Sequence, residues 1–263
     1  MRISFRMSLP SVLGNDLAGE VVALGSGVEG IKVGDEVMAM LELGHPGAYA
    51  EYAVVPARLL AKKPANLDFT NAAAVPLAGL TALQLLRRSR RFTKGARVLV
   101  NGASGGVGSF VIQIAKAGGA VVTGVTSGKN MALVRALGAD AVVDYTQEDA
   151  LHGGPYDVVV DTVGNMSFWR ARKALANEGA FVSSDPKPGL FIAHALTSFS
   201  RKRAFAGIVK PCAEDLETIA ELIVQGKVRP LVERVFSLSE AQDAHRHLET
   251  NRTRGKLVLA IAS

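Results

Sequence analysis

The stretch RVLVNGASGGVGSFVIQIAK, Arg97 to Lys116, decides the fold of this chain. It opens with a short apolar run typical of a buried strand and closes with the apolar spacing of a helix. Four glycines lie between the two: Gly102, Gly105, Gly106 and Gly108. Glycines at such a turn let the backbone approach a pyrophosphate, whose charge is stabilised by the free N–H groups of the following helix. The stretch therefore predicts a dinucleotide-binding turn; the alternative is a tight turn that binds no ligand.

The segments on either side of this stretch predict the rest of the architecture. Before it, apolar runs at residues 19–24, 35–40 and 48–55 are separated by glycine-bearing turns, which is typical of β structure. Around and after it, strand-like runs alternate with helical patterns: 97–101, 120–125, 140–145, 156–161, 179–184 and 203–209. This alternation predicts an α/β fold, a doubly wound parallel Rossmann sheet accompanied by a smaller β-rich unit.

Composition excludes several classes of protein. The chain has 263 residues, 48% of them hydrophobic, and its formal charge of +6 comes from 30 basic residues interspersed with 24 acidic ones. Its basic clusters, at 87–97 and 201–203, contain a single aromatic residue, Phe92, and lack the motif context of a nucleic-acid module, so we expect no nucleic-acid partner. No run of 18 uncharged apolar residues occurs, so we expect no membrane partner. The single cysteine, Cys212, fits a reducing compartment, and we expect a cytoplasmic protein.

The segment VTSGKN, residues 125–130, indicates which dinucleotide binds. A site for NAD usually has an acid about 20 residues after the glycines, whereas a site for NADP replaces it with small polar and basic residues. No acid lies between Gly108 and Arg135, and Ser127 and Lys129 stand where a 2′-phosphate would bind. The sequence therefore predicts NADP(H) as the cofactor. The alternative for Lys129 is a solvated lysine in the first turn of a helix.

Two dehydrogenase families fit the glycine spacing, and one of them fails a further test. Short-chain dehydrogenases need a tyrosine acid four residues before a lysine, downstream of the glycines. Only Tyr145 and Tyr156 lie downstream, and the fourth residues after them are Asp149 and Val160. The required pair is therefore missing from this sequence.

The segment VLGNDLAGEVVALGSGVEGIKVGDEV, residues 12–37, resembles the medium-chain dehydrogenase/reductase superfamily. The resemblance implies a GroES-like domain at residues 1–78, completed by 212–263, and a Rossmann NADP(H)-binding domain at 79–211. Members of this family carry about sixty further residues before this segment, and a GroES-like domain without them exposes unpaired strand edges. We expect Met1 to be an internal methionine of a longer protein; the alternative is a natural remnant.

Zinc alcohol dehydrogenases of this superfamily carry G-H-E-x-x-G where this chain has GNDLAG, with Asn15 and Asp16 replacing His and Glu. One cysteine cannot supply their further zinc ligands. His245 and His247 do not share a helix face, so we expect surface histidines and no metal site.

The chain is instead similar to the zinc-independent quinone oxidoreductase branch, which includes enone reductases. The similarity rests on residues 95–116, with Ala96 an exception to the usual pattern, and on PLAGLTA, LGADAVVDY, YDVVVDTVG and GKLVL at 76–82, 137–145, 156–164 and 255–259. The resemblance implies that Thr81 lies by the nicotinamide, Tyr145 by the adenosine phosphate, and Thr162 and Val163 along the nicotinamide ribose.

We expect the pyrophosphate turn to consist of Ala103, Ser104, Gly105, Gly106, Val107 and Gly108. No catalytic acid can be named, because Tyr49 and Tyr52, the tyrosines of the β-rich unit, would point to opposite faces of a strand. The expected reaction is hydride transfer from NADPH to a small quinone or α,β-unsaturated carbonyl. The alternative is a non-catalytic NADPH-binding protein with an interaction or sensing role. The strand at 203–209 could also pair two copies into a homodimer.

Overall fold

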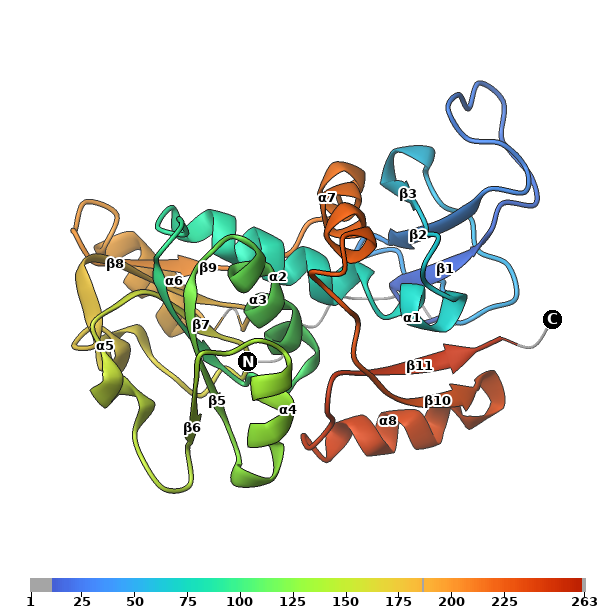
Figure 1. The fold of residues 1–263 in the computed structure, drawn as a ribbon. Coiled ribbons are helices and arrows are strands. Elements are labelled where there is room, and N and C mark those ends of the chain that lie inside the picture. Colours follow the sequence, from blue (N-terminus) through green and yellow to red (C-terminus); the bar gives the residue numbers. More distant parts are fainter. Residues whose placement is uncertain (1–10, 186, 262–263) are drawn as a thin grey trace. The chain divides into compact units, whose positions relative to one another are not determined.

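The computed structural model describes residues 11–185 and 187–261. These residues divide into two compact units, Thr81–Val209 and residues 11–80 together with 210–261. Each unit has its own sheet or sheets and its own buried core (Figure 1).

The first unit is built on six parallel strands in the order β6-β5-β4-β7-β8-β9. They are β4 Arg97–Asn101, β5 Val121–Thr126, β6 Ala141–Asp144, β7 Tyr156–Asp161, β8 Leu175–Ser183 and β9 Arg203–Ala206. The helices are α2 Pro76–Ser89, whose first turn belongs to the other unit, α3 Gly106–Ala117, α4 Met131–Ala136, α5 Phe168–Ala171 and α6 Pro188–Leu196, with short 3-10 turns η2 Gly128–Asn130 and η3 Ala150–Gly153. The predicted doubly wound parallel sheet is confirmed.

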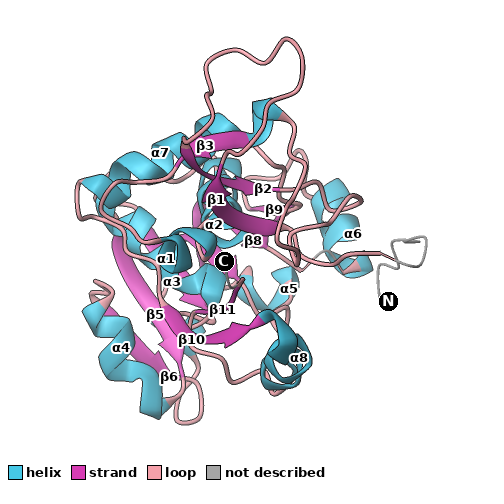
Figure 2. Cartoon of the chain, turned by 90° about the vertical axis from the view of Figure 1, so that its right-hand side faces the viewer, coloured by secondary structure: helices cyan, strands magenta, loops and turns pink. Residues whose placement is uncertain are grey.

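Helices pack against both faces of this sheet (Figures 1 and 2). On one face Leu99, Val159 and Phe181 pack with Phe168 of α5 and Leu190 of α6. Helices α3 and α4 contact strands β4 to β6, and a Cβ at Gly124 of β5 would meet the side chain of Val134 in α4. Because both faces are covered, the strands are apolar along almost their whole length.

The second unit contains a three-stranded antiparallel sheet, β1 Asp16–Glu20, β2 Glu36–Met40 and β3 Leu60–Lys62, and a parallel pair, β10 Val232–Ser237 with β11 Lys256–Ala260. Its helices are α1 Phe69–Ala73, α7 Ala213–Val224 and α8 Ala241–Glu249, with 3-10 turns η1 Ala57–Leu59 and η4 Leu238–Glu240. Met38, Met40, Leu216 and Ile219 are fully buried and form its centre.

The expected strand at 48–55 is wrong. These residues form bends and irregular backbone, and Tyr52 and Val54 are 74% and 98% exposed. A strand needs a neighbour to receive its backbone hydrogen bonds, and the described strands of this unit do not pair with the segment. The strand predicted at 19–24 is also displaced, because β1 ends at Glu20 and Val22 is exposed.

Two further expectations changed at their ends. Strand β9 stops at Ala206, before the predicted residue 209, and a Cβ at the following Gly207 would lie 2.1 Å from the side chain of Leu85. Strand β8 begins at Leu175, four residues before the predicted residue 179. In the described ranges no helix has the length and apolar character that crossing a membrane requires.

Candidate functional site

The glycine turn between β4 and α3 is closed so tightly that side chains are excluded from it. Gly102 has a φ of 83°, and a Cβ at Gly108 would lie 2.1 Å from the Gly102 carbonyl oxygen. Gly105 is the N-cap of α3, and its N–H donates to the Gly102 carbonyl at 3.0 Å. Among the described residues, nothing accepts from the N–H groups of Gly106, Val107 and Gly108. This bare backbone with three free donors suits an anion such as a pyrophosphate.

The turn after β7 lies directly against this glycine turn. A Cβ at Gly102 would lie 2.5 Å from Thr162 Oγ1 and 2.6 Å from Val163 Cγ2. The Thr162 N–H and hydroxyl both donate to the Asn101 carbonyl, at 3.1 and 2.8 Å. The structure therefore brings Thr162 and Val163 to Gly102, where the strand order reverses between β4 and β7. Open parallel sheets bind ligands at this switch point.

Ser104 of the glycine turn is joined to the loop that follows β5. Its hydroxyl accepts from Thr126 Oγ1 at 3.0 Å and from Asn130 Nδ2 at 3.2 Å. The same Asn130 amide lies 3.5 Å from Ser127 Oγ. Ser104 and Ser127 are therefore held near one another at the carboxyl ends of β4 and β5, and Ala103 is buried beneath them.

The remaining residues predicted for the adenosine end lie on the same edge of the sheet. Lys129 is exposed within η2, and Tyr145 is 63% exposed while its N–H donates to the Thr126 carbonyl at 3.1 Å. Asp144, the last residue of β6, was missed. A Cβ at Gly128 would lie 2.6 Å from Asp144 Oδ2, so a carboxylate lies beside Gly128, the residue between Ser127 and Lys129 in the sequence. The acid of an NAD site is expected after β5, whereas Asp144 ends β6.

Thr81 lies in α2. It is 6% exposed and lines a small recess with Gln84, Leu85 and the segment Gly207–Val209 that follows β9. Its role at the nicotinamide end stays a prediction.

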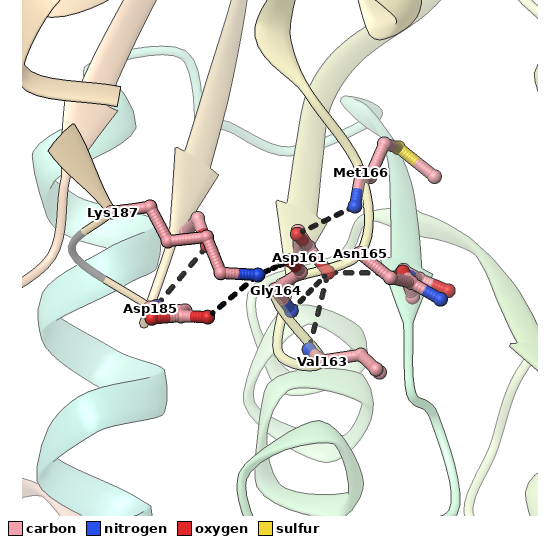
Figure 3. Close-up of polar contacts among 9 residues, drawn as sticks. Asp161, Val163, Gly164, Asn165, Met166, Asp185 and Lys187 are labelled. Carbon is pink, nitrogen blue, oxygen red and sulfur yellow. Dashed lines mark hydrogen bonds and ion pairs between the residues drawn. The ribbon is translucent and has the colours of Figure 1, made fainter. Parts of the chain in front are cut away.

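Asp161 was also missed, although it ends an apolar strand directly before Thr162. Its side chain is fully buried and accepts four hydrogen bonds (Figure 3). Oδ1 accepts from Asn101 Nδ2 at 2.9 Å and from the N–H groups of Val163 and Gly164 at 3.1 Å each, and Oδ2 accepts from the Met166 N–H at 3.3 Å. A polar residue that closes an apolar run was the signal available in the sequence.

In the second unit, Asn15 and Asp16 form hydrogen bonds and an ion pair that are typical of a structural role and not of zinc ligation. The Asn15 amide donates to the carbonyls of Glu42 and Leu41, at 3.1 and 3.5 Å. Asp16 accepts from the Leu77 N–H at 2.8 Å and from Lys256 Nζ at 3.1 Å. Zinc prefers cysteine, histidine and carboxylate ligands in a tetrahedron, and within 11–185 and 187–261 no group of three such side chains gathers. The residues present therefore do not fit a zinc site.

The same unit holds a cavity of about 410 Å³, lined in part by Tyr49, His245, Asp16 and Lys256. Burial raises the pKa of Tyr49, and Asp16 raises it further against the opposing effect of Lys256. The Tyr49 hydroxyl therefore keeps its proton at neutral pH. His245 is exposed with its ring 5.9 Å from that of Tyr49, and His247 lies 3.3 Å from Glu233, which agrees with surface histidines.

Comparison with known proteins gives two family matches. Residues 137–259 match the family described as zinc-binding dehydrogenase, and residues 1–65 match the alcohol dehydrogenase GroES-like domain. A chloroplast envelope quinone oxidoreductase homolog of Arabidopsis thaliana is 36% identical over 262 residues, which are 95% of this chain and 80% of the relative. A chloroplastic NADPH-dependent alkenal/one oxidoreductase of the same plant is 40% identical over 263 residues, 95% of this chain but 64% of the relative.

The similarity extends to solved structures. The quinone oxidoreductase from Coxiella burnetii superposes with a TM-score of 0.89 at 37% sequence identity, over 97% of this chain and 81% of that chain. This chain thus spans between about two thirds and four fifths of the proteins to which it is compared.

Proposed function

Because the chain belongs to the medium-chain dehydrogenase/reductase superfamily, in its quinone oxidoreductase branch, we propose that it is an NADPH-dependent oxidoreductase. The proposed reaction is hydride transfer to a quinone or an α,β-unsaturated carbonyl, without zinc. Two relatives are named for such activities: one is a quinone oxidoreductase homolog and the other an NADPH-dependent alkenal/one oxidoreductase.

The observation that carries the proposal is the glycine turn. Gly102 and Gly108 have no room for a Cβ, so the turn closes tightly against α3, and the N–H groups of Gly106, Val107 and Gly108 at the N-terminus of this helix carry the positive end of its dipole. A pyrophosphate accepts hydrogen bonds from such donors. When bound there, NADPH would supply the hydride.

The preference for NADPH over NADH rests on Ser127 and Lys129. A charge-assisted hydrogen bond from Lys129 to a 2′-phosphate contributes about 1.5–3 kcal/mol, which is roughly ten- to 150-fold in affinity. The Asp144 carboxylate beside Gly128 opposes a phosphate at the same place. We propose that the lysine outweighs it, because Lys129 is exposed and its long, flexible side chain can bring the ammonium group into direct contact with the phosphate.

The chemistry needs positioning more than acid–base groups from the chain. A hydride added to an electron-poor carbon leaves an enolate or a hydroquinone anion, and water can supply the proton that completes the product. We therefore assign no catalytic acid. Asn15 and Asp16 are engaged by backbone carbonyls, Leu77 and Lys256, and the proposed reaction uses no metal to polarise the carbonyl.

The cellular location and the oligomeric state are proposals separate from that of the reaction. We propose a cytoplasmic protein, although relatives are named as chloroplastic or mitochondrial. We also propose a homodimer through β9, because the described sheet ends in this strand and an edge strand carries unpaired backbone groups.

The test is a steady-state assay of the purified chain with NADPH and a panel of quinones, alkenals and enones. We expect NADPH oxidation that depends on at least one acceptor and is unaffected by a zinc chelator. Tight NADPH binding without oxidation above background would favour the non-catalytic binding protein. If NADPH does not bind at all, both the oxidoreductase hypothesis and the binding-protein hypothesis are wrong.

A further inference from the structure

Asp161 is a fully buried carboxylate that lies at the edge of the sheet. It is 0% exposed at the carboxyl end of β7, opposite Asn101 of β4 in the register of the sheet. All four groups that donate to it are neutral: the Asn101 amide and the N–H groups of Val163, Gly164 and Met166. Burying a charge costs free energy unless its lone pairs are hydrogen-bonded, so the four donors are what make this carboxylate tolerable.

Both oxygens of Asp161 are needed to receive this set of donors. Oδ1 accepts three hydrogen bonds and Oδ2 accepts one. An asparagine at this position would offer one oxygen, and its NH₂ group would face a backbone N–H. The shape of the turn that follows β7 therefore depends on the two acceptor oxygens of Asp161 and not only on its size.

Four of the five backbone N–H groups of residues 162–166 are bound within the protein. Asp161 takes the N–H groups of Val163, Gly164 and Met166, and the Asn101 carbonyl takes that of Thr162.

The carbonyl oxygens of Gly164, Thr162 and Val163 differ in whether a group of the protein donates to them. Lys187 Nζ donates to the Gly164 carbonyl and lies 3.2 Å from Asp185 Oδ2 (Figure 3). Within the described ranges no group donates to the carbonyl oxygens of Thr162 and Val163. These two carbonyl oxygens are therefore available as acceptors for a ligand.

We propose that Asp161 is a positioning residue for the reaction. Its carboxylate holds the turn of residues 162–166 so that the Thr162 and Val163 carbonyls receive hydrogen bonds from ligand hydroxyl groups next to the glycine turn. The contact of Gly102 with Thr162 and Val163 sets the distance between the two turns. The inference rests on the proposed function, because the hydroxyl-bearing ligand half would be the nicotinamide ribose of NADPH.

The test compares two ligands that share the adenosine end. Adenosine 2′,5′-bisphosphate carries the adenosine and its 2′-phosphate but no nicotinamide ribose, whereas NADPH carries both. We expect Asp161→Asn to raise the dissociation constant of NADPH about tenfold or more, and to leave that of the bisphosphate within about twofold. Kd for both ligands is measured by isothermal titration calorimetry on the full chain.

A purely structural role for Asp161 would give a different result. If the fold is loosened as a whole, both ligands weaken together, and that outcome overturns the proposal. Equal affinity of wild type and variant for NADPH overturns it too. Failure of the wild type to bind either ligand overturns the proposed function and this inference with it.

A second variant keeps the test available if Asp161→Asn does not fold. Lys187 is 60% exposed and holds the same turn from the solvent side, so Lys187→Met should leave the core intact. We expect it to weaken NADPH about threefold without changing the affinity for the bisphosphate. Lys173→Met, at an exposed lysine of the same unit, is the matched control and should change neither affinity. Equal values for Lys187→Met and Lys173→Met would refute the proposal.

Discussion

Replacing Gly108 by alanine perturbs the close-packed turn directly. The added Cβ would lie 2.1 Å from the carbonyl oxygen of Gly102, 2.8 Å from its carbonyl carbon and 3.0 Å from Ala103 Cα. All three are backbone atoms, which cannot turn aside as the end of a long side chain can. Ordinary contact begins near 3.4 Å, so the turn and α3 must separate by about 1.3 Å, the difference between 3.4 and 2.1 Å.

This separation is large enough to break hydrogen bonds to a bound pyrophosphate. An N–H···O bond of about 2.9 Å is lost when its atoms move apart by more than about half an ångström. A hydrogen bond to a charged group contributes about 1.5–3 kcal/mol, so losing one lowers the affinity for NADPH about ten- to 150-fold. Crowding of the packed turn also lowers the free energy of unfolding by about 1–3 kcal/mol, which corresponds to a fall in Tm of roughly 2–12 °C.

Calorimetric titration with NADPH and a thermal unfolding curve measure the two effects on the same sample. The matched control is Gly189→Ala in α6 of the same unit, where an added Cβ meets nothing within 4 Å. The control should bind NADPH as the wild type does. If Gly108→Ala also binds with wild-type affinity, the pyrophosphate does not lie on this turn and the reasoning is refuted.

Lys129→Ala should raise KM for NADPH about tenfold or more but KM for NADH by less than twofold, because only NADPH carries the 2′-phosphate. Asp144→Asn should act in the opposite sense and increase the preference for NADPH, and steady-state KM values for both cofactors decide both cases; equal effects on the two cofactors would remove the assignment. A hydrogen bond from Arg170 holds the pKa of Asp149 below its usual range, so this carboxylate adds stability above its unfolded-state pKa and loses it as pH falls through the folded-state pKa. Asp149→Asn should therefore lower the free energy of unfolding at pH 7 by less than about 1 kcal/mol, and urea unfolding curves of variant and wild type should converge between about pH 4 and pH 2; a difference that persists at low pH would contradict this. Sedimentation at micromolar concentration should give a dimer that pairs through Arg203–Ala206, and a monomer would refute that interface.

Local sequence patterns were enough for the sheet of the first unit. Each of its six strands contains a short apolar run, although β8 also extends back through the polar Asn177 and Glu178, and the glycines after β4 mark both the end of that strand and the start of α3. Apolar runs predict these strands correctly because a strand that is buried on both faces consists mainly of apolar residues. The segment 48–55 has the same composition but no pairing partner, and pairing cannot be read from one segment alone.

The site was predictable only where its chemistry is local. The glycine turn depends on residues within seven positions of one another, and its spacing is visible in the sequence. The contact of Gly102 with Thr162 joins residues sixty positions apart, so it exists only after β4 and β7 pair. The contacts of Asp161 with Asn101 and of Asp144 with Gly128 likewise join residues far apart in the sequence, and no local spacing predicts them.

A common feature of the missed residues would nevertheless have been visible. Five of the six parallel strands end on a polar residue: Asn101, Thr126, Asp144, Asp161 and Ser183. A buried polar group is costly unless it is hydrogen-bonded, so a polar residue that closes an apolar strand must bind something close to the sheet edge.

In this chain the partners of these strand ends include residues of the neighbouring loops. Thr126 donates a hydrogen bond to Ser104 of the glycine turn. Asp144, which lies beside Gly128, accepts one from Thr146. Asn101 and Asp161 bind one another and hold the turn after β7. The strand ends therefore act on two separate loop groups, β5 and β6 at the proposed adenosine end and β4 and β7 at the proposed nicotinamide end. A substitution of Asp161 should for that reason weaken one half of a dinucleotide and spare the other.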